Sequence, residues 1–117
     1  MTAVHGGTWV HVTTLDDLWE GELLPVNVDG VDVIVLNVGG EVVAYEDRCP
    51  HVANPLSSGM FDGELLVCAA HQWKFTALDG QGVNPAVACL RRFAVQVVDE
   101  AIAVNVHDVV QEPRGMQ

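Results

Sequence analysis

The sequence predicts an all-β fold, an antiparallel β-sandwich or barrel, and three observations support this prediction. Hydrophobic residues make up 50% of the chain and aromatic residues only 6%, with valine prominent, a composition that favours strands over helices. Short apolar or alternating runs recur along the chain. Gly, Asp and Asn separate these runs, as expected of turns between antiparallel strands.

The N-terminal part is expected to form one strand and one short helix. Residues 8–12 alternate loosely between polar and apolar side chains, which indicates a strand. Residues 14–17 (Thr-Leu-Asp-Asp) have the form of a helix start, because Thr can cap and the two Asp suit the positive end of the helix dipole. Leu15, Leu18 and Trp19 would then share one face of a helix of about two turns.

The strongest strand signal lies in the next section. Residues 31–38 form an apolar run that predicts a strand, and residues 22–28 predict a weaker strand before it. Gly39-Gly40 predicts a hairpin turn into a further strand at residues 41–45.

The chain changes character after this hairpin. Residues 47–63 are rich in Pro, Ser, Asn, Asp and Gly, which predicts an irregular loop. We expect a single domain over residues 1–117, with ligand-bearing loops at about residues 47–85. The remaining expected elements are short strands at 64–68 and 73–76, a turn-rich loop at 79–85, a hairpin of 92–98 and 101–106 through Asp99-Glu100, and a frayed tail at 112–117.

The charge of the chain narrows the choice of partners. Five basic and 16 acidic residues give a formal net charge of −11. A phosphate backbone would repel such a surface, so we expect no nucleic-acid partner. A basic protein partner is favoured, although the charge can also serve solubility alone. No run is long enough to span a membrane and residues 1–7 lack a signal-peptide pattern, so a soluble cytoplasmic protein is expected.

Two short motifs carry the candidate chemistry. They are Cys49-Pro50-His51 and Cys68-Ala69-Ala70-His71, with sixteen residues between His51 and Cys68. Each motif offers one thiolate and one imidazole, and thiolates are soft donors that suit iron in a cluster. Each motif follows a predicted strand, so both loops are expected at one tip of the fold. The third cysteine, Cys89, is expected to be a small buried hydrophobe.

Two Cys and two His also form the ligand set of a structural zinc site. Zinc ligands, however, are usually paired as Cys-x(2–4)-Cys and His-x(3–5)-His. Here each cysteine is paired with a histidine. This pairing argues against zinc. Because the four ligand types would nevertheless suit zinc, a zinc-bound interaction domain remains an alternative of a different class.

The Cys-x-His … Cys-x-x-His arrangement resembles the ligand set of Rieske [2Fe–2S] proteins. The stretch at residues 48–75 resembles a Rieske ferredoxin, including Leu56-Ser57-Ser58-Gly59 and Trp73-Lys74-Phe75. Residues 80–85 and Cys89-Leu90 narrow the resemblance to the ferredoxin component of bacterial multicomponent diiron monooxygenases that oxidise toluene, related arenes or alkenes. The resemblance extends over about residues 8–106.

The resemblance implies one [2Fe–2S] cluster per chain. Cys49 and Cys68 would hold the inner iron, and His51 and His71 the outer iron. Two ferric ions, two sulfides and two thiolates sum to zero formal charge, which makes an added electron easier to accept than with four thiolates. Around these ligands, Gln72, Trp73 and Pro85 are the expected neighbours of the cluster, with Trp73 packed beneath the loops.

At two places this sequence differs from other groups of Rieske proteins, and both differences support the resemblance to the monooxygenase ferredoxins. Rieske proteins of respiratory complexes carry an extra disulfide between the loops, but Asn54 and Ala70 stand at the matching positions. The reduction potential is therefore expected at the low end for His-ligated clusters, about −150 mV. Ferredoxins of ring-hydroxylating dioxygenases usually have Gly after the second His, where this chain has Gln72.

The resemblance implies an electron carrier and no enzyme. A flavin reductase that uses NADH would reduce the cluster, and the diiron hydroxylase of an aromatic or alkene monooxygenase would receive the electrons. The ferredoxin of an arene dioxygenase is the alternative of the same class, whereas the length argues against the Rieske domain of an oxygenase itself. The chain is expected to be a monomer.

A few residues beside the motifs have an expected place. Met60 and Phe61 are expected in the core, with an apolar contact near the tip as the other interpretation. Asp47, Arg48 and Lys74 flank the loops, as docking charges or as solvated surface charges.

Overall fold

The computed structural model describes residues 9–50, 54–69, 72–84 and 87–114. Within these ranges the regular secondary structure is nearly all strand, with two single-turn 3₁₀ helices, and turns and loops make up most of the remainder. The elements are β1 (Val10–Thr14), η1 (Leu15–Asp17), β2 (Leu23–Val28), β3 (Val31–Val38), β4 (Glu41–Glu46), η2 (Leu56–Ser58), β5 (Met60–Phe61), β6 (Leu65–Val67), β7 (Lys74–Thr76), β8 (Gly82–Asn84), β9 (Arg92–Val98) and β10 (Ala101–Gln111).

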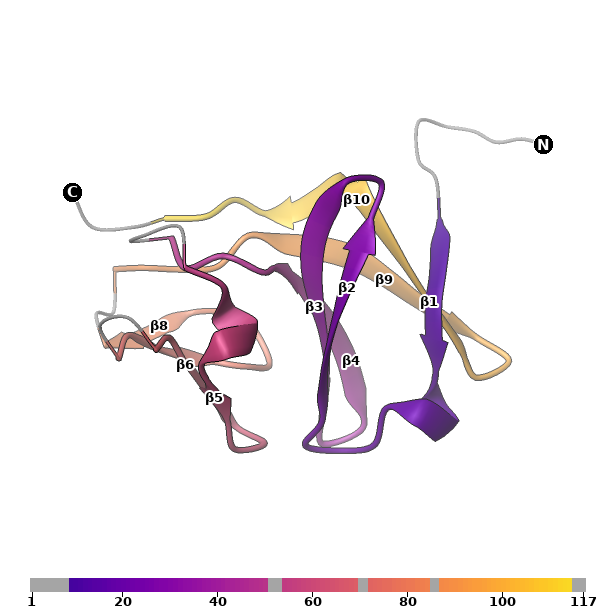
Figure 1. The fold of residues 1–117 in the computed structure, drawn as a ribbon, viewed down its shortest axis with the longest axis horizontal. Coiled ribbons are helices and arrows are strands. Elements are labelled where there is room, and N and C mark those ends of the chain that lie inside the picture. The colour runs from indigo at the N-terminus through magenta and orange to yellow at the C-terminus, as the bar shows by residue number, and fades with distance from the viewer. Residues whose placement is uncertain (1–8, 51–53, 70–71, 85–86, 115–117) are drawn as a thin grey trace.

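The strands form two antiparallel sheets. The larger sheet has the order β1-β10-β9-β4-β3-β2, and the smaller sheet has the order β5-β6-β7-β8. The edge strands β1 and β2 of the larger sheet contact each other, so this sheet is a nearly closed barrel. Figure 1 shows the smaller sheet at one end of the molecule, beside β3 and β4. The predicted all-β sandwich or barrel is confirmed.

Strand β3 is buried on both faces because it separates two hydrophobic cores. Val33 and Val35 point into a core inside the larger sheet, whereas Ile34 and Leu36 point into a second core shared with the smaller sheet. All four side chains are fully buried. Side chains alternate between the faces of a strand, so a strand with a core on each side has a continuous apolar sequence.

Three two-residue turns connect the hairpins of the larger sheet. They are Asp29-Gly30, Gly39-Gly40 and Asp99-Glu100, and both residues of each turn have positive φ. This is the type I′ geometry that matches the twist of the flanking strands. The third turn reaches it without glycine, at φ of 51° for Asp99 and 70° for Glu100.

The predicted two-turn helix at the N-terminus is wrong. Only Leu15–Asp17 form a 3₁₀ turn, and Leu18 leaves it in an extended conformation with φ −137° and ψ 90°. That conformation turns the Leu18 side chain into the core, where it is 1% exposed. Trp19 does not share the buried face and is 69% exposed.

The C-terminal half has more strand than predicted. Strand β8 lies inside the expected loop at 79–85, and β10 runs five residues beyond the expected end at residue 106. The expectation that residues 112–117 are frayed is wrong for residues 112–114. The amide and carbonyl groups of Cys89 and Arg114 are paired at 2.8 and 3.0 Å, while residues 115–117 lie outside the described part.

The non-glycine turn generates the first prediction. Left-handed backbone costs an ordinary residue about 1–2 kcal/mol, whereas glycine adopts it freely but costs about 0.5–1 kcal/mol in unfolded-chain entropy. Glu100→Gly should therefore raise the stability by about 0.5–1 kcal/mol, measured as a higher thermal unfolding midpoint. The control Glu41→Gly lies within strand β4 and should lower the midpoint. A lower midpoint for Glu100→Gly would refute the prediction.

Candidate metal centre

The structure brings the two motif cysteines into one core. Cys49 follows strand β4 and Cys68 follows strand β6, and they are 2% and 0% exposed. Both belong to the core shared by the two sheets, together with Tyr45, Leu56 and Phe75. The prediction that both loops meet at one end of the fold is consistent with this packing (Figure 1).

The two cysteine loops are closed in the same way. The amide N–H of Cys49 donates to the carbonyl of Asn54 at 2.9 Å, and the amide N–H of Cys68 donates to the carbonyl of Trp73 at 2.8 Å. In both loops the bond joins a cysteine to the residue five positions later, so each motif histidine falls within the closed segment. His51 and His71 themselves lie outside the described residues, as does Pro85.

Gln72 closes the second loop with its backbone. Its φ is +57°, and its amide N–H donates to the carbonyl of Cys68 at 2.9 Å. A left-handed conformation favours glycine, which gives a physical reason for the Gly expected at this position in dioxygenase ferredoxins. The Gln72 side chain is exposed, so the contribution of this residue to the loop is conformational.

The neighbours of the loops differ in their burial. Trp73 is half-buried and packs against the shared core, as a loop anchor would. Phe61 packs against the same core, but Met60 is 68% exposed. The expected core position of Met60 is therefore wrong, because alternation along β5 turns its side chain outward when Phe61 points inward.

Asp47 braces the first loop instead of standing free as a docking charge. Its two carboxylate oxygens accept hydrogen bonds from the Ser57 amide N–H at 2.8 Å and the Ser57 hydroxyl at 2.7 Å. These bonds tie the start of the Cys49 loop to η2 on its far side. No local pattern in the sequence indicates this contact, because Asp47 and Ser57 are ten positions apart.

Tyr45 is buried in the core that the two sheets share, and its hydroxyl connects two parts of the chain. The Tyr45 hydroxyl donates to the Ala77 carbonyl at 2.6 Å and so joins β4 to the chain that follows β7. Burial raises the pKa of the Tyr45 hydroxyl well above its usual value, so it remains a neutral donor. Gly80 lies against the ring, since a Cβ there would come within 2.7 Å of Tyr45 Cε1.

The chemistry of these side chains fits an iron–sulfur cluster. A thiolate buried without a cation nearby is strongly disfavoured, whereas metal ligation stabilises it. Two buried cysteines in matched loops therefore provide a dry place for two soft sulfur donors. Among the described residues, which exclude both histidines, no three His, Cys, Asp or Glu side chains converge on one point.

Buried thiols on two matched loops, one after β4 of the barrel and one after β6 of the small sheet, are the features of a metal-binding electron-transfer domain. The chain belongs to the Rieske [2Fe–2S] domain family, whose model matches residues 8–108. It therefore binds a [2Fe–2S] cluster, which confirms the resemblance found in the sequence and the cofactor that it implied.

Three similar proteins are ferredoxin components of oxygenase systems. The ferredoxin component of the alkene monooxygenase system of Xanthobacter autotrophicus is 33% identical over 89% of this chain and 86% of that protein. The ferredoxin component of biphenyl 2,3-dioxygenase from Rhodococcus jostii is 33% identical over 76% and 84%. The ferredoxin component shared by naphthalene 1,2-dioxygenase and salicylate 5-hydroxylase systems of a Ralstonia species is 29% identical over 76% and 86%.

Solved structures give the same result. The ferredoxin of carbazole 1,9a-dioxygenase from Nocardioides aromaticivorans superposes with a TM-score of 0.74 at 33% identity, covering 83% of this chain and 96% of that one. A chain from the complex of reduced oxygenase and oxidised ferredoxin in carbazole 1,9a-dioxygenase gives 0.79 at 29% identity, covering 89% and 97%. No helix within the described ranges is long and apolar enough to cross a membrane.

A close backbone contact beside Cys68 generates the second prediction. A methyl group at Gly59 would collide with the carbonyl oxygen of Val67 and crowd the Ala69 amide nitrogen at 3.3 Å. Because these are backbone atoms at the end of β6 and in the second loop, Gly59→Ala should cost about 3 kcal/mol or more and lower the iron content per chain. Gly63→Ala is the control for strain without a collision: its φ is +99°, so alanine is strained there, but a Cβ meets nothing within 4 Å, and the iron content should stay that of wild type. Equal iron content in both variants would refute the prediction.

Proposed function

We propose that this protein is the ferredoxin component of a multicomponent oxygenase, a carrier of single electrons and not an enzyme. The observation that carries the proposal is that relatives matching most of the chain, and most of their own length, are ferredoxin components. The family match over residues 8–108 accounts for nearly all of the chain, so we treat residues 1–117 as one Rieske domain.

The cluster ligands in this proposal are Cys49 and Cys68 on the inner iron and His51 and His71 on the outer iron. The matched closure of the two loops and the burial of both cysteines support this assignment. The bound cluster supplies one reversible electron at a His-ligated iron. The chain holds the described ends of the loops in place and excludes water from the side of the two buried cysteines.

The proposed partners are a flavin reductase that uses NADH and an oxygenase that accepts the electrons. A solved complex of a ferredoxin with an oxygenase contains a chain that superposes on this one, which supports an oxygenase as acceptor. The protein would act as a cytoplasmic monomer, because a small carrier must leave one partner to reach the next.

The diiron hydroxylase of an alkene or aromatic monooxygenase is the first choice of acceptor. The alkene monooxygenase ferredoxin matches 89% of the chain, compared with 76% for the biphenyl dioxygenase ferredoxin at the same identity of 33%. Gln72 instead of Gly supports the same choice. A Rieske dioxygenase is the second candidate, favoured by the naphthalene and biphenyl dioxygenase ferredoxins among the relatives.

The third prediction tests the ligands. Wild-type protein should contain two irons per chain and give, after reduction by dithionite, an EPR signal with the low average g-value of a His-ligated [2Fe–2S] cluster. Cys68→Ser should abolish the signal. Cys89→Ser is the matched control and should keep it, because the Cys89 thiol contacts the Glu112 carbonyl at 3.2 Å in another part of the fold. A colourless protein with one zinc per chain would establish the structural zinc domain instead.

The fourth prediction tests the acceptor. Reduced protein should be reoxidised in stopped-flow mixing at least about tenfold faster by a diiron alkene-monooxygenase hydroxylase than by a naphthalene-type dioxygenase, since docking with a non-cognate partner lowers the association rate. Auto-oxidation in buffer provides the baseline. The reverse preference would assign the protein to the dioxygenase systems, and no reoxidation by either class would remove the proposed function.

A further inference from the structure

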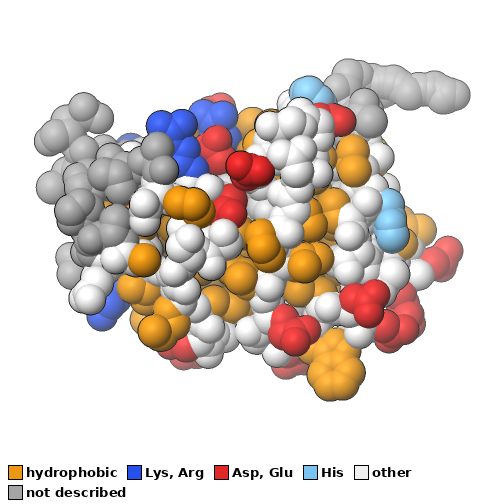
Figure 2. Space-filling view, in the orientation of Figure 1, with side chains coloured by type: hydrophobic (Ala, Val, Ile, Leu, Met, Phe, Trp, Pro, Cys, Tyr) orange, Lys and Arg blue, Asp and Glu red, His pale blue; other side chains and the backbone are white. Residues whose placement is uncertain are grey.

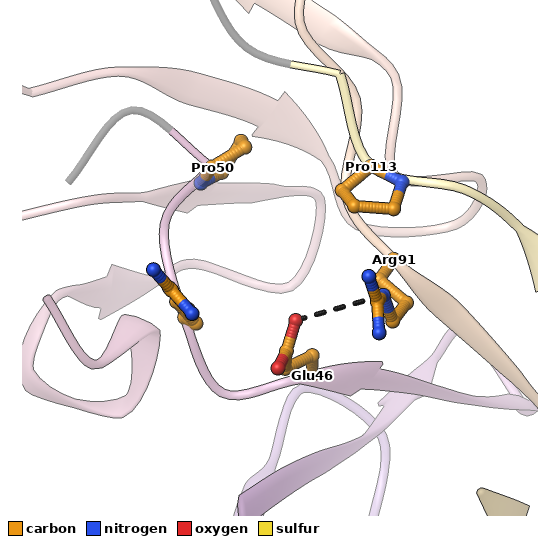
Figure 3. A pocket seen from close by; sticks show the side chains of 5 residues that line it. Glu46, Pro50, Arg91 and Pro113 are labelled. Carbon is orange, nitrogen blue, oxygen red and sulfur yellow. Dashed lines mark ion pairs between the residues drawn. The ribbon is translucent and has the colours of Figure 1, made fainter. Parts of the chain in front are cut away.

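A small pocket lies directly beside the first cysteine loop. Its volume is about 220 Å³, and it is lined by Glu46, Arg48, Pro50, Arg91 and Pro113. Figure 3 shows Glu46 at the end of β4, Arg91 opposite it, and Pro50 and Pro113 at the rim. Two of these residues, Arg48 and Pro50, flank Cys49 in the sequence. Whatever occupies this pocket therefore contacts a cluster-binding loop.

Arg91 enters the pocket with unused hydrogen-bonding capacity. Its Nε atom is buried and has no hydrogen-bond partner among the described residues. The Glu46 carboxylate is 3.7 Å from Nε and the Glu112 carboxylate is 3.9 Å from Nη2, both beyond the 2.7–3.2 Å of a good N–H···O bond. A buried donor without an acceptor is costly, so Arg91 is not fully paired within the chain, and its side chain, 38% exposed, leaves part of the guanidinium open to an additional acceptor.

Arg48 adds a second guanidinium to the pocket. The acidic residue next to it in the sequence, Asp47, is already hydrogen-bonded to another residue. Both carboxylate oxygens of Asp47 accept hydrogen bonds from Ser57. Within the described part of the chain, Arg48 forms no ion pair, and its side chain is exposed. The lining of the pocket thus contains two cations and one carboxylate, that of Glu46.

We propose that this pocket binds the carboxylate of an Asp or Glu side chain of the oxygenase that accepts the electron. This inference rests on the proposed function. Guanidinium groups bind carboxylates through parallel, charge-assisted hydrogen bonds, and Arg48 and Arg91 can supply them from two sides. The pocket is smaller than the roughly 300–1,000 Å³ of small-molecule sites, but it is large enough for one acidic side chain.

The location of the pocket also fits the overall charge of the protein. The net charge of −11 favours a basic partner surface, yet Figure 2 shows Lys and Arg side chains gathered on the half that carries the small sheet, with Asp and Glu side chains beside them and also around the opposite end. One acidic side chain within a mostly basic partner surface would fix the orientation of the cluster loops, because contacts of opposite sign set register at an interface.

Arg48→Gln and Arg91→Gln test the proposal. Reduced variants are mixed with the purified oxygenase in a stopped-flow instrument, and the second-order rate constant of cluster oxidation is measured as a function of ionic strength. Each variant should react about tenfold more slowly than wild type at low salt, and the difference should shrink as salt is raised. Arg48→Lys should recover part of the rate, since it keeps the charge but loses the planar fork.

Arg92→Gln is the matched control. It removes the same charge from the next residue, but Arg92 lies in a different pocket, where its guanidinium is 3.9 Å from Glu41. It should change the rate by less than about twofold, since its charge lies outside the proposed pocket and is already paired with Glu41. Iron content and the EPR signal must equal those of wild type in every variant used. Arg91 lies outside both cysteine loops, so its variant serves if the Arg48 variant loses iron.

The outcomes separate the inference from the proposed function. Transfer by wild type that is slowed in Arg48→Gln and Arg91→Gln, but not in Arg92→Gln, supports the carboxylate pocket. Transfer that is equal in all four proteins, or slowed equally by Arg92→Gln, overturns the pocket and leaves the proposed function intact. No transfer from wild type to any oxygenase overturns both.

Discussion

The metal centre depends on one core that two sheets share. The strands of the small sheet are only two or three residues long, too short to bury a core between themselves. The additional apolar surface comes from Ile34 and Leu36 of β3 and from Val43 and Tyr45 of β4, which belong to the same core as both motif cysteines. The barrel therefore serves as the support on which the cluster loops are held, and a change in that core acts on the metal site at a distance.

The C-terminal strand makes this support rigid. The Gln111 amide donates to the Leu90 carbonyl at 2.8 Å and to the Asp79 carbonyl at 3.2 Å, and its oxygen accepts from Gln81 at 2.7 Å. The backbone pairing of Cys89 with Arg114 continues the same seam. A carrier benefits from such bracing, because loops that are held before and after an electron arrives need little reorganisation, the same advantage that preorganised dipoles give to enzymes.

Several of these features follow from the sequence and others do not, for physical reasons. The β3–β4 hairpin and the cysteine loops were predictable, since a continuous apolar run, Gly-Gly and paired Cys/His motifs are local signals. The 3₁₀ turn at Leu15–Asp17 was not, because burial of Leu18 overrides helix propensity. Nor was β8, which exists only as a partner of β7. The hydrogen bonds that close the two loops in the same way could not be predicted either. They join backbone groups, and a backbone bond between a cysteine amide and the carbonyl five residues later needs no particular side chain.

The electrostatics show why a net charge is a weak guide to a docking site. With −11 overall, the chain attracts basic surfaces from a distance, and that long-range term is screened beyond about 8–10 Å at physiological salt. At contact, only the nearest groups matter, and beside the first cysteine loop these are Arg48 and Arg91 with loosely held Glu46. Long-range attraction would thus speed encounter with a basic partner, while the arginine pocket would decide how that partner is oriented at the cluster. A carrier that must bind briefly and in one orientation gains from separating these two tasks, because steering raises the association rate without adding the tight contacts that would slow release.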